Sequence, residues 1–133
     1  MIGDALQSLD INDYVLVAGV PTNETDFLNS FRKVVGKDAT NTAILSSDPS
    51  KFGVTWTQIA PKIAELQAAE PMRRMKEQRN IKLAETDWWS CSDLTMTQSQ
   101  KDYRQALRDL PATAEPKIEN RQLTNITWPE KPE

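Results

Sequence analysis

The sequence contains no histidine and only one cysteine, Cys91, among its 133 residues. Histidine is the commonest general base and a frequent metal ligand, so its absence removes the residue on which many catalytic and metal sites depend. A single cysteine excludes an intramolecular disulfide and a cysteine-rich metal site. We therefore expect a protein that is not an enzyme, with no catalytic residues, no metal site and no cofactor.

Long apolar runs and an excess of positive charge are also missing. No run approaches the roughly 20 apolar residues that cross a bilayer, and the mean hydropathy is -0.59. The first 13 residues include three aspartates and no basic residue, unlike a secretory signal or a transit peptide. The formal net charge of -3 gives no general attraction to nucleic acid or anionic lipid. We expect no membrane partner.

Residues 1–70 predict a small α+β domain of the order β-α-β-(β)-α. Segment 1–13 is typical of either a marginal helix or an extended arm. Short runs of strand-forming residues follow at 14–18 and 42–46, and 51–55 is either a third strand or an extended approach to a helix. A sheet of two or three short strands is therefore expected.

A helix is predicted between the first two strands, over residues 22–36. Thr22 or Asn23 can cap its start, and Gly36 is well placed to end it. Phe27, Phe31 and Val34 then share one face at helical spacing. The two phenylalanines are expected to pack in the core against the neighbouring strand.

The next helix is predicted to begin after Thr55, which is a plausible cap. Its apolar stripe has spacings of three, four and three: Trp56, Ile59, Ile63 and Leu66. Pro71 then removes one backbone hydrogen bond, which predicts either one long helix with a kink or two consecutive helices. We place the boundary between the N-terminal and C-terminal units here.

Residues 71–111 predict a helical hairpin. Thr97 and Gln100 have the spacing of a capping box, and the helix that they start has one apolar face. That face consists of Tyr103, Ala106, Leu107 and Leu110, whereas Arg104, Arg108 and Asp109 are expected to lie away from it. Pro111 is expected to end the helix, which then folds back on residues 72–85.

The first helix of this hairpin carries a basic segment. Arg73, Arg74, Lys76, Arg79 and Lys82 are accompanied by one acid within residues 71–82, Glu77. No aromatic residue is interleaved for stacking bases, so a solvated helix surface is expected ahead of nucleic-acid binding. Contact with an acidic protein surface is the stronger functional alternative.

Aromatic residues mark the remaining candidate sites. Trp88 and Trp89 are adjacent, so one should pack inward while the other caps the hairpin or meets a partner. The segment 112–133 predicts an extended tail pinned by Trp128, either onto the hairpin or onto a partner. Cys91 has no histidine to activate it and is expected to be a bystander.

The C-terminal half resembles the phage tail assembly chaperone family. The resemblance rests on Arg79-Asn80, Leu83, Asp87-Trp88, the string YRQALRDLP over 103–111, Trp128-Pro129 and Lys131-Pro132. Lys82 stands where a second leucine is usual, and residues 112–127 form a longer segment than is typical. The N-terminal half resembles the domain that precedes this motif in proteins of marine cyanobacterial phages. Residues carried over from the motif are Trp88, Tyr103, Arg104, Arg108, Pro111 and Trp128.

The resemblance implies a virus protein that acts through protein–protein contacts. The first expectation is a structural or docking protein of the virion, in several copies, bound to other tail proteins of the fibre, baseplate or tube. The alternative is a non-virion assembly chaperone in the host cytoplasm. A nucleic-acid-binding protein acting through 73–82 and a small enzyme using Asp87 and Asp93 are more remote alternatives. The expected contact or packing anchors are Trp88, Trp89, Tyr103, Arg104, Arg108 and Trp128.

Overall fold

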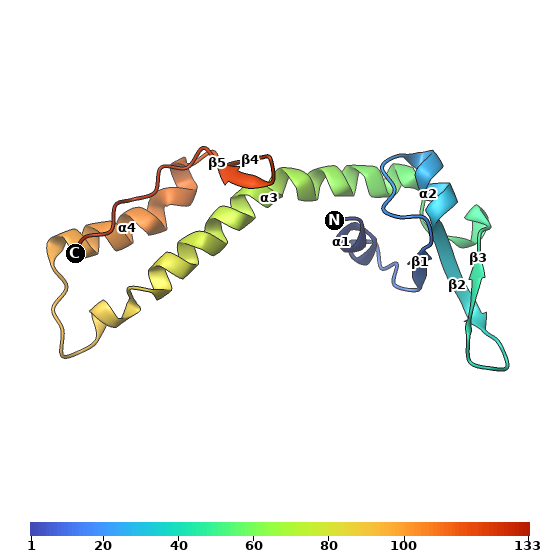
Figure 1. Cartoon of the computed structure of the whole chain (residues 1–133), viewed down its shortest axis with the longest axis horizontal. Coiled ribbons are helices and arrows are strands. Elements are labelled where there is room, and N and C mark those ends of the chain that lie inside the picture. The colour runs from blue at the N-terminus through green and yellow to red at the C-terminus, as the bar shows by residue number, and fades with distance from the viewer. The chain divides into compact units, whose positions relative to one another are not determined.

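A computed structural model describes residues 1–133, and Figure 1 shows the order of its helices and strands. The chain divides into two units, which we call unit 1 (Met1–Ala68) and unit 2 (Ala69–Glu133). Both helices and small antiparallel sheets are present, so the predicted α+β class is confirmed.

Unit 1 begins with helix α1 (Ile2–Ser8), followed by strand β1 (Tyr14–Leu16). The helical alternative for the first residues is therefore the right one, because α1 buries Ile2, Ala5 and Leu6 in the core. An isolated seven-residue helix is marginal in water, so this burial is what stabilises it.

Helix α2 (Glu24–Ser30) runs directly into strand β2 (Phe31–Lys37). Asn23 caps α2, since its side chain accepts a hydrogen bond from the backbone N–H of Asp26. The prediction that this helix continues to Gly36 is wrong. Residues 31–37 instead form a strand that pairs with another strand on each side. The apolar spacing of this short segment is compatible with a helix or a strand, and the cross-strand hydrogen bonds favour the strand.

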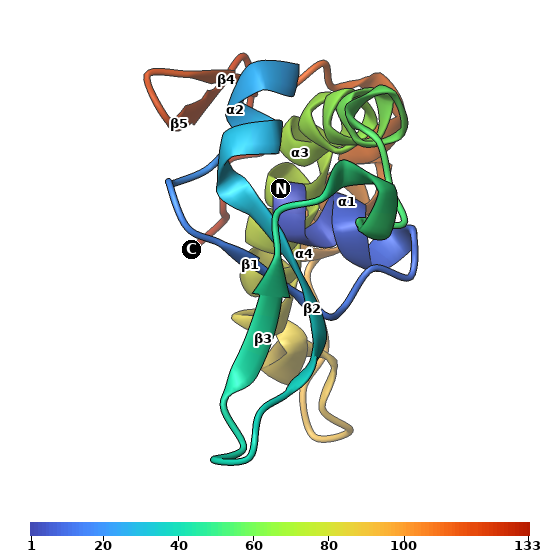
Figure 2. The same cartoon turned by 90° about the vertical axis from the view of Figure 1, so that its right-hand side faces the viewer.

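Strand β2 is the centre of a three-stranded antiparallel sheet, between β1 and β3 (Ala43–Ser46). A register shift between Val34 and Gly36 marks a β-bulge opposite β3. The loop that joins β2 to β3 extends beyond the helices of unit 1 (Figures 1 and 2). The β-α-β-β-α order is thus present. The strand predicted at 42–46 is β3, whereas β2 lies in a segment that was predicted to be helical.

The predicted third strand at 51–55 is absent. A short 3₁₀ helix, η1 (Pro49–Lys51), leads instead to an irregular segment that buries Phe52 and Val54. This agrees with the alternative of an extended approach to the next helix. The segment contributes core side chains to unit 1 without contributing a strand.

The core of unit 1 is aromatic. Phe27, Phe31 and Phe52 are buried, and their ring centroids lie 4.7–5.7 Å apart. Tyr14 stacks on Phe31 at 5.4 Å, and Trp56 lies 6.0 Å from Phe27. Such pairs add about 0.5–1.5 kcal/mol each beyond the burial of their area. The expected burial of Phe27 and Phe31 is confirmed, although Phe31 comes from a strand.

Helix α3 (Trp56–Ala84) is 29 residues long and includes both Pro61 and Pro71. The helix is continuous through Pro71, so the alternative of two consecutive helices is wrong. One lost hydrogen bond is tolerated because the residues on both sides are good helix formers. At the start of α3, the Thr55 N–H donates to the Gln58 side chain at 2.9 Å.

Unit 2 continues with the 3₁₀ helix η2 (Asp87–Ser90), helix α4 (Gln98–Thr113) and strands β4 (Lys117–Glu119) and β5 (Gln122–Thr124). The two strands pair as an antiparallel hairpin. Its turn places Asn120 and Arg121 at φ 50° and 65°, which is the pattern of a type I′ turn. The tail is therefore not uniformly extended as predicted, because local pairing supplies its backbone hydrogen bonds.

Candidate partner-docking site

The candidate site lies where the end of α3, the 3₁₀ helix η2 and the first turns of α4 meet. Its α4 side begins at the capping box predicted from the sequence. The Thr97 side chain accepts from the Gln100 N–H at 3.2 Å, and the Gln100 side chain accepts from the Thr97 N–H at 3.0 Å. The start of α4 is therefore fixed by local hydrogen bonds.

The buried face of α4 differs from the predicted stripe. Tyr103 and Leu107 are buried as expected, but Ala106 is exposed and Arg104 is buried. The buried face of α4 includes Arg104 in place of Ala106 because the Arg104 guanidinium donates hydrogen bonds to polar groups at and just after the end of α3. Apolar periodicity alone assigns arginine to the solvent side, so it missed this residue.

Helix α4 also runs through Pro111 to Thr113 instead of ending there. Proline lacks one backbone donor, so the only intrahelical bond lost is to the carbonyl of Leu107. The Ala114 N–H donates to the Leu110 carbonyl at 2.9 Å and closes the last turn. Pro111 therefore marks the last turn of the helix and not its final residue.

Trp89 lies at the centre of a small core. Trp89, Tyr103 and Leu107 are buried, and Leu83, Met96 and Trp128 pack against them. The Trp89 and Tyr103 rings lie 6.1 Å apart. Burial of the Tyr103 phenol, followed by the charge of Glu85, raises its pKa. This core joins η2, α4 and the tail.

Trp88 has the opposite orientation and is 59% exposed. Its ring makes an edge contact with Trp89, with the centroids 6.2 Å apart. Hydrogen bonds within η2 fix its backbone: the Trp89 N–H donates to the Thr86 carbonyl, and the Cys91 N–H donates to the Trp88 carbonyl. One tryptophan is thus packed inward while its neighbour is presented to solvent by an ordered backbone.

Arg104 connects α4 to the end of α3. Its guanidinium donates to the Leu83 carbonyl at 2.9 Å, to the Thr86 hydroxyl at 2.7 Å and to the Asp87 carboxylate at 2.9 Å. The Leu83 carbonyl, near the end of α3, also accepts from the Thr86 N–H at 3.1 Å, so Arg104 adds a further donor to it. Thr86, which is fully buried, donates in turn to the Leu83 carbonyl at 3.1 Å. The prediction that Arg104 faces away is wrong.

Arg108 is exposed, one turn beyond Arg104. It makes no hydrogen bond or ion pair in the structure, and it borders a shallow groove shared with Met96 and Gln105. The sequence placed Arg104 and Arg108 together on the outer surface of α4. The structure separates them into a buried hydrogen-bonding residue and a free surface cation.

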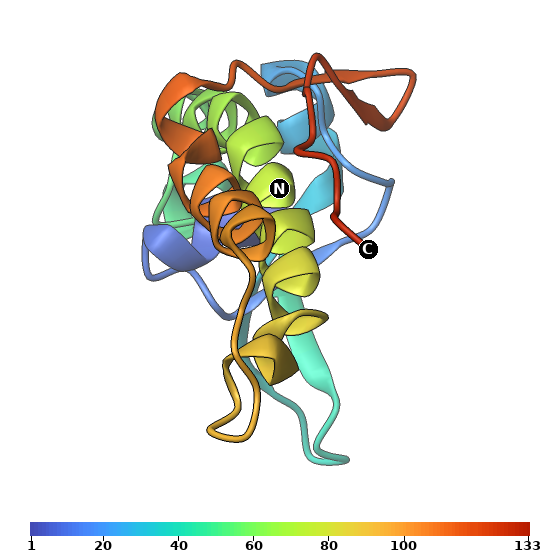
Figure 3. The same ribbon diagram turned by 90° about the vertical axis from the view of Figure 1, so that its left-hand side faces the viewer.

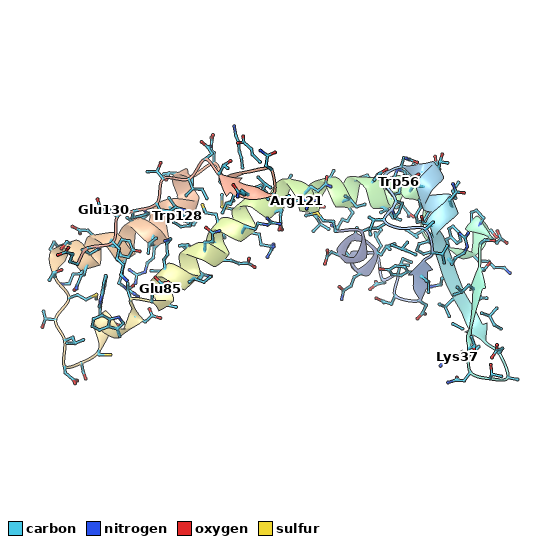
Figure 4. The ribbon with its side chains drawn as sticks, in the orientation of Figure 1. Lys37, Trp56, Glu85, Arg121, Trp128 and Glu130 are labelled. Atoms are coloured by element: carbon cyan, nitrogen blue, oxygen red, sulfur yellow. The ribbon has the colours of Figure 1, made fainter.

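The tail crosses the cluster through two lysine–tryptophan contacts. Lys82 Nζ lies 5.2 Å from the centre of the Trp128 ring, and Lys131 Nζ lies 6.0 Å from that of Trp89. Figure 1 shows the C-terminal residues running back along α4, and Figure 4 labels Trp128 on that segment. Each such contact contributes about 0.5–1 kcal/mol at an exposed site. Lys82, unusual at its position, therefore helps to hold the tail.

The basic segment 73–82 is partly neutralised by acids of the same helix, which pair with two of its five cations. Arg73 pairs with Glu70 and Glu77, and Arg74 pairs with Glu70 at 2.7 Å. Hydrogen bonds from Arg73, then from Arg74, lower the pKa of Glu70 to about 2. Glu70 lies just before the segment, so counting charges over 71–82 missed it. These pairs leave less free positive charge for nucleic acid.

The residues considered for chemistry do not come together. Asp87 accepts from Arg104, whereas Asp93 accepts from the Ser92 hydroxyl at 3.1 Å. Cys91 is exposed and unpaired. No group of three or more Asp, Glu, His or Cys side chains is arranged to hold a metal ion, and no helix has the length and apolarity to cross a membrane.

The comparison with protein families matches this half of the chain. Residues 72–133 match the family model described as phage tail assembly chaperone protein, which confirms the family suggested by the motif of the C-terminal half. Neither the curated proteins nor the solved structures contain a significant match. The match establishes a role related to the phage tail.

Proposed function

We propose, from the membership of residues 72–133 in the phage tail assembly chaperone family, that this protein is a docking component of the virion tail. It binds a fibre, baseplate or tube protein through the exposed ring of Trp88. The observation that carries the proposal is the pairing of a buried Trp89 with a Trp88 that is 59% exposed. The proposal includes no catalytic step and no cofactor.

The energetics of interfaces favour Trp88 as the contact residue. Tryptophan is enriched among the few residues that supply most of the binding free energy at protein interfaces. A ring held by an ordered backbone loses little conformational entropy on binding. Trp88 meets that condition because η2 and the buried Trp89 ring fix its position.

Arg104 and Arg108 have separate roles in this proposal. Arg104 is a positioning residue, because its hydrogen bonds join α4 to Thr86 and Asp87, next to Trp88. Arg108 is exposed and free to pair with an acidic group of the partner. A surface pair of this kind affects the rate of association and the choice of partner more than the affinity.

The description of the matched family favours a second candidate function. An assembly chaperone would use the same exposed tryptophan to bind a tail component transiently, and would leave before the particle is complete. The two functions share a surface and differ in where the protein is found at the end of assembly.

The location of the protein separates the two candidates. We expect quantitative mass spectrometry of purified particles to find it at a constant number of copies per virion. Abundance in infected lysate combined with absence from mature particles would instead establish the chaperone and rule out the virion component.

Substitution of Trp88 tests the docking surface itself. Trp88→Ala should fold normally but reduce co-purification with its tail partner at least tenfold, as expected for a hot-spot residue worth about 1.4 kcal/mol or more. Ile81→Ala is the matched control, since Ile81 is 60% exposed and lies in the same unit. Equal partner recovery by both variants would exclude Trp88 as the contact.

A further inference from the structure

Strand β3 forms a free edge of the unit 1 sheet. The strand order is β1-β2-β3, so β3 has β2 on one side and no strand on the other. In Figure 2, β3 lies in the foreground of unit 1, and no other segment is drawn in front of it. A free edge presents unpaired backbone N–H and C=O groups, to which another strand can bind.

The outward backbone groups of this edge belong to Ala43 and Leu45. The Asp38 N–H donates to the Thr42 carbonyl, so the backbone groups of Thr42 face β2. Alternate residues of an antiparallel strand direct their N–H and C=O groups to the same side. The irregularity in this pairing lies on β2, so the alternation along β3 is unbroken. Ile44 therefore faces β2, and the residue on each side of it faces outward.

The β3 edge lacks the features that protect most edge strands. Natural edges carry charges or proline, which discourage pairing with another chain. Residues 39–47 contain no charged residue and no proline. Ile44 and Leu45 are 46% and 41% exposed. The other edge strand, β1, follows Asp13 directly and so begins at a charge. Of the two edges, β3 is the one open to a further strand.

The outer part of the β2–β3 ribbon consists of two strands only. β1 pairs with β2 over Phe31–Lys33, so residues 35–37 of β2 have β3 as their one neighbouring strand. Figures 2 and 3 show this ribbon extending past α1, and Val35 in it is 48% exposed. Two strands alone are marginally stable in water, and a third stabilises them. The occupant that this ribbon favours is therefore a strand.

The edge of β3 is complementary to a second copy of itself. In a two-fold antiparallel pairing centred on Ile44, Ala43 of each copy lies opposite Leu45 of the other. The outward N–H and C=O groups of both residues are then hydrogen-bonded at once. On one face Ile44 meets Ile44 of the second copy, and on the other a small side chain meets a large one. No like charges are brought together within residues 39–47, because this stretch has none.

We propose that two copies of this protein pair through β3 in antiparallel orientation, which joins their three-stranded sheets into one continuous sheet. Both copies use the same strand, so the contact closes at a dimer and does not grow into a filament. The contact lies in unit 1 and does not use Trp88. It is therefore independent of the proposed contact with a tail partner.

The wild type tests the proposal through its dependence on concentration. Sedimentation should show the 15.1 kDa monomer giving way to a dimer as the concentration rises. In hydrogen exchange, the amides of Ala43 and Leu45 should exchange rapidly in dilute solution and become protected where the dimer forms. The amide of Ile44 faces β2 and should be protected at every concentration.

Opposite charges at Ile44 test the register, because this residue lies opposite its own copy. Ile44→Lys and Ile44→Glu should each remain monomeric where the wild type is a dimer, since each variant places two like charges directly opposite one another. An equimolar mixture should form a dimer again, because unlike charges then meet. Recovery in the mixture requires that the two copies pair with each other.

Val35→Lys is the matched control for the added charge. Val35 is exposed to nearly the same extent as Ile44 but lies on β2, away from the free edge. This variant should form a dimer like the wild type, and circular dichroism should report native folding for every variant. Leu45→Pro is the second edge variant if the Ile44 variants fail to fold. Proline there removes an outward N–H without removing a hydrogen bond to β2, and should also abolish the dimer.

Four results would overturn the proposal. The first is a wild type that stays monomeric at every soluble concentration, including one whose β3 amides become protected only when a tail protein is added. The second is a dimer in which the amides of Ala43 and Leu45 stay unprotected. The third is a mixture of the two Ile44 variants that remains monomeric. The fourth is a mass that grows beyond the dimer. The recovery of a tail partner by Trp88→Ala is measured separately, so failure here leaves the proposed function standing.

Discussion

Units 1 and 2 reach an ordered core by different physical means. Unit 1 packs Phe27, Phe31 and Phe52 against one another, with eight buried residues in one cluster. Unit 2 has a cluster of only three buried residues, and Arg104 adds three hydrogen bonds beside it. The comparison teaches that a small helical unit compensates for a modest apolar core with polar and lysine–tryptophan contacts that join its segments.

Removing the central ring of the unit 1 cluster should have the largest effect. Phe31 is fully buried and has aromatic neighbours in Tyr14, Phe27 and Phe52. Phe31→Ala should lower the free energy of unfolding by about 3–5 kcal/mol, because it leaves a cavity in a close-packed core. Urea unfolding followed by circular dichroism measures this change. A loss below about 1 kcal/mol would contradict the aromatic core described for unit 1.

Truncating Trp89 tests the smaller core of unit 2. Trp89→Ala should cost about 3 kcal/mol, at the low end for a large aromatic residue because solvent is close to this core. The loss of Trp128 packing should accompany it, seen as a shift in tryptophan fluorescence toward that of exposed indole. A fully native spectrum would show that unit 2 does not depend on this ring.

Arg104→Ala should destabilise unit 2 through its polar contacts. The change removes donors from the Leu83 carbonyl and from the Thr86 hydroxyl, and should cost about 2 kcal/mol. Arg108→Ala is the control on the same helix and should stay within about 0.5 kcal/mol of the wild type, because Arg108 is exposed and unpaired. Equal unfolding midpoints for the two variants would deny Arg104 a structural role.

The smallest expected effect is an acid-dependent one at Glu70. Its folded-state pKa of about 2 lies below the ordinary value of 4.5 because Arg73 and Arg74 donate to the carboxylate. A lowered pKa stabilises the folded state fully above pH 4.5, and this contribution is lost as the pH falls toward 2. Glu70→Gln should therefore flatten the loss of thermal stability across that window. An unchanged pH profile would show that the ion pairs do not form in solution.

Several features could be predicted because their causes lie within a few residues. The Thr97–Gln100 capping box, the Asn23 cap and the start of α3 all follow from short-range hydrogen bonding. The burial of one tryptophan and the exposure of its neighbour were also expected, because two adjacent side chains cannot both enter one narrow core. Which of them faces inward depends on η2 and was decided by the fold.

The errors have a common physical origin in contacts between distant segments. Phe27 and Phe31 have helical spacing, yet Phe31 enters a strand because β1 and β3 supply hydrogen bonds on both sides. Arg104 was assigned to solvent, yet it bonds to Leu83, Thr86 and Asp87, some 17 to 21 residues earlier. The strands that pair with β2 and the acceptors that bind Arg104 lie outside the few residues over which apolar spacing is counted, so that spacing could not predict them.

By itself, the sequence determined the α+β class, the capping box that starts α4, the inward packing of one of two adjacent tryptophans and the family that residues 72–133 match. These depend on composition, helix caps and short motifs, which act over a few residues. Only the tertiary structure decided that 31–37 is a central strand, that Arg104 is buried and that Trp88 is the exposed tryptophan. Those outcomes depend on which distant backbone groups and side chains meet, and on the cost of burying any polar group without a partner.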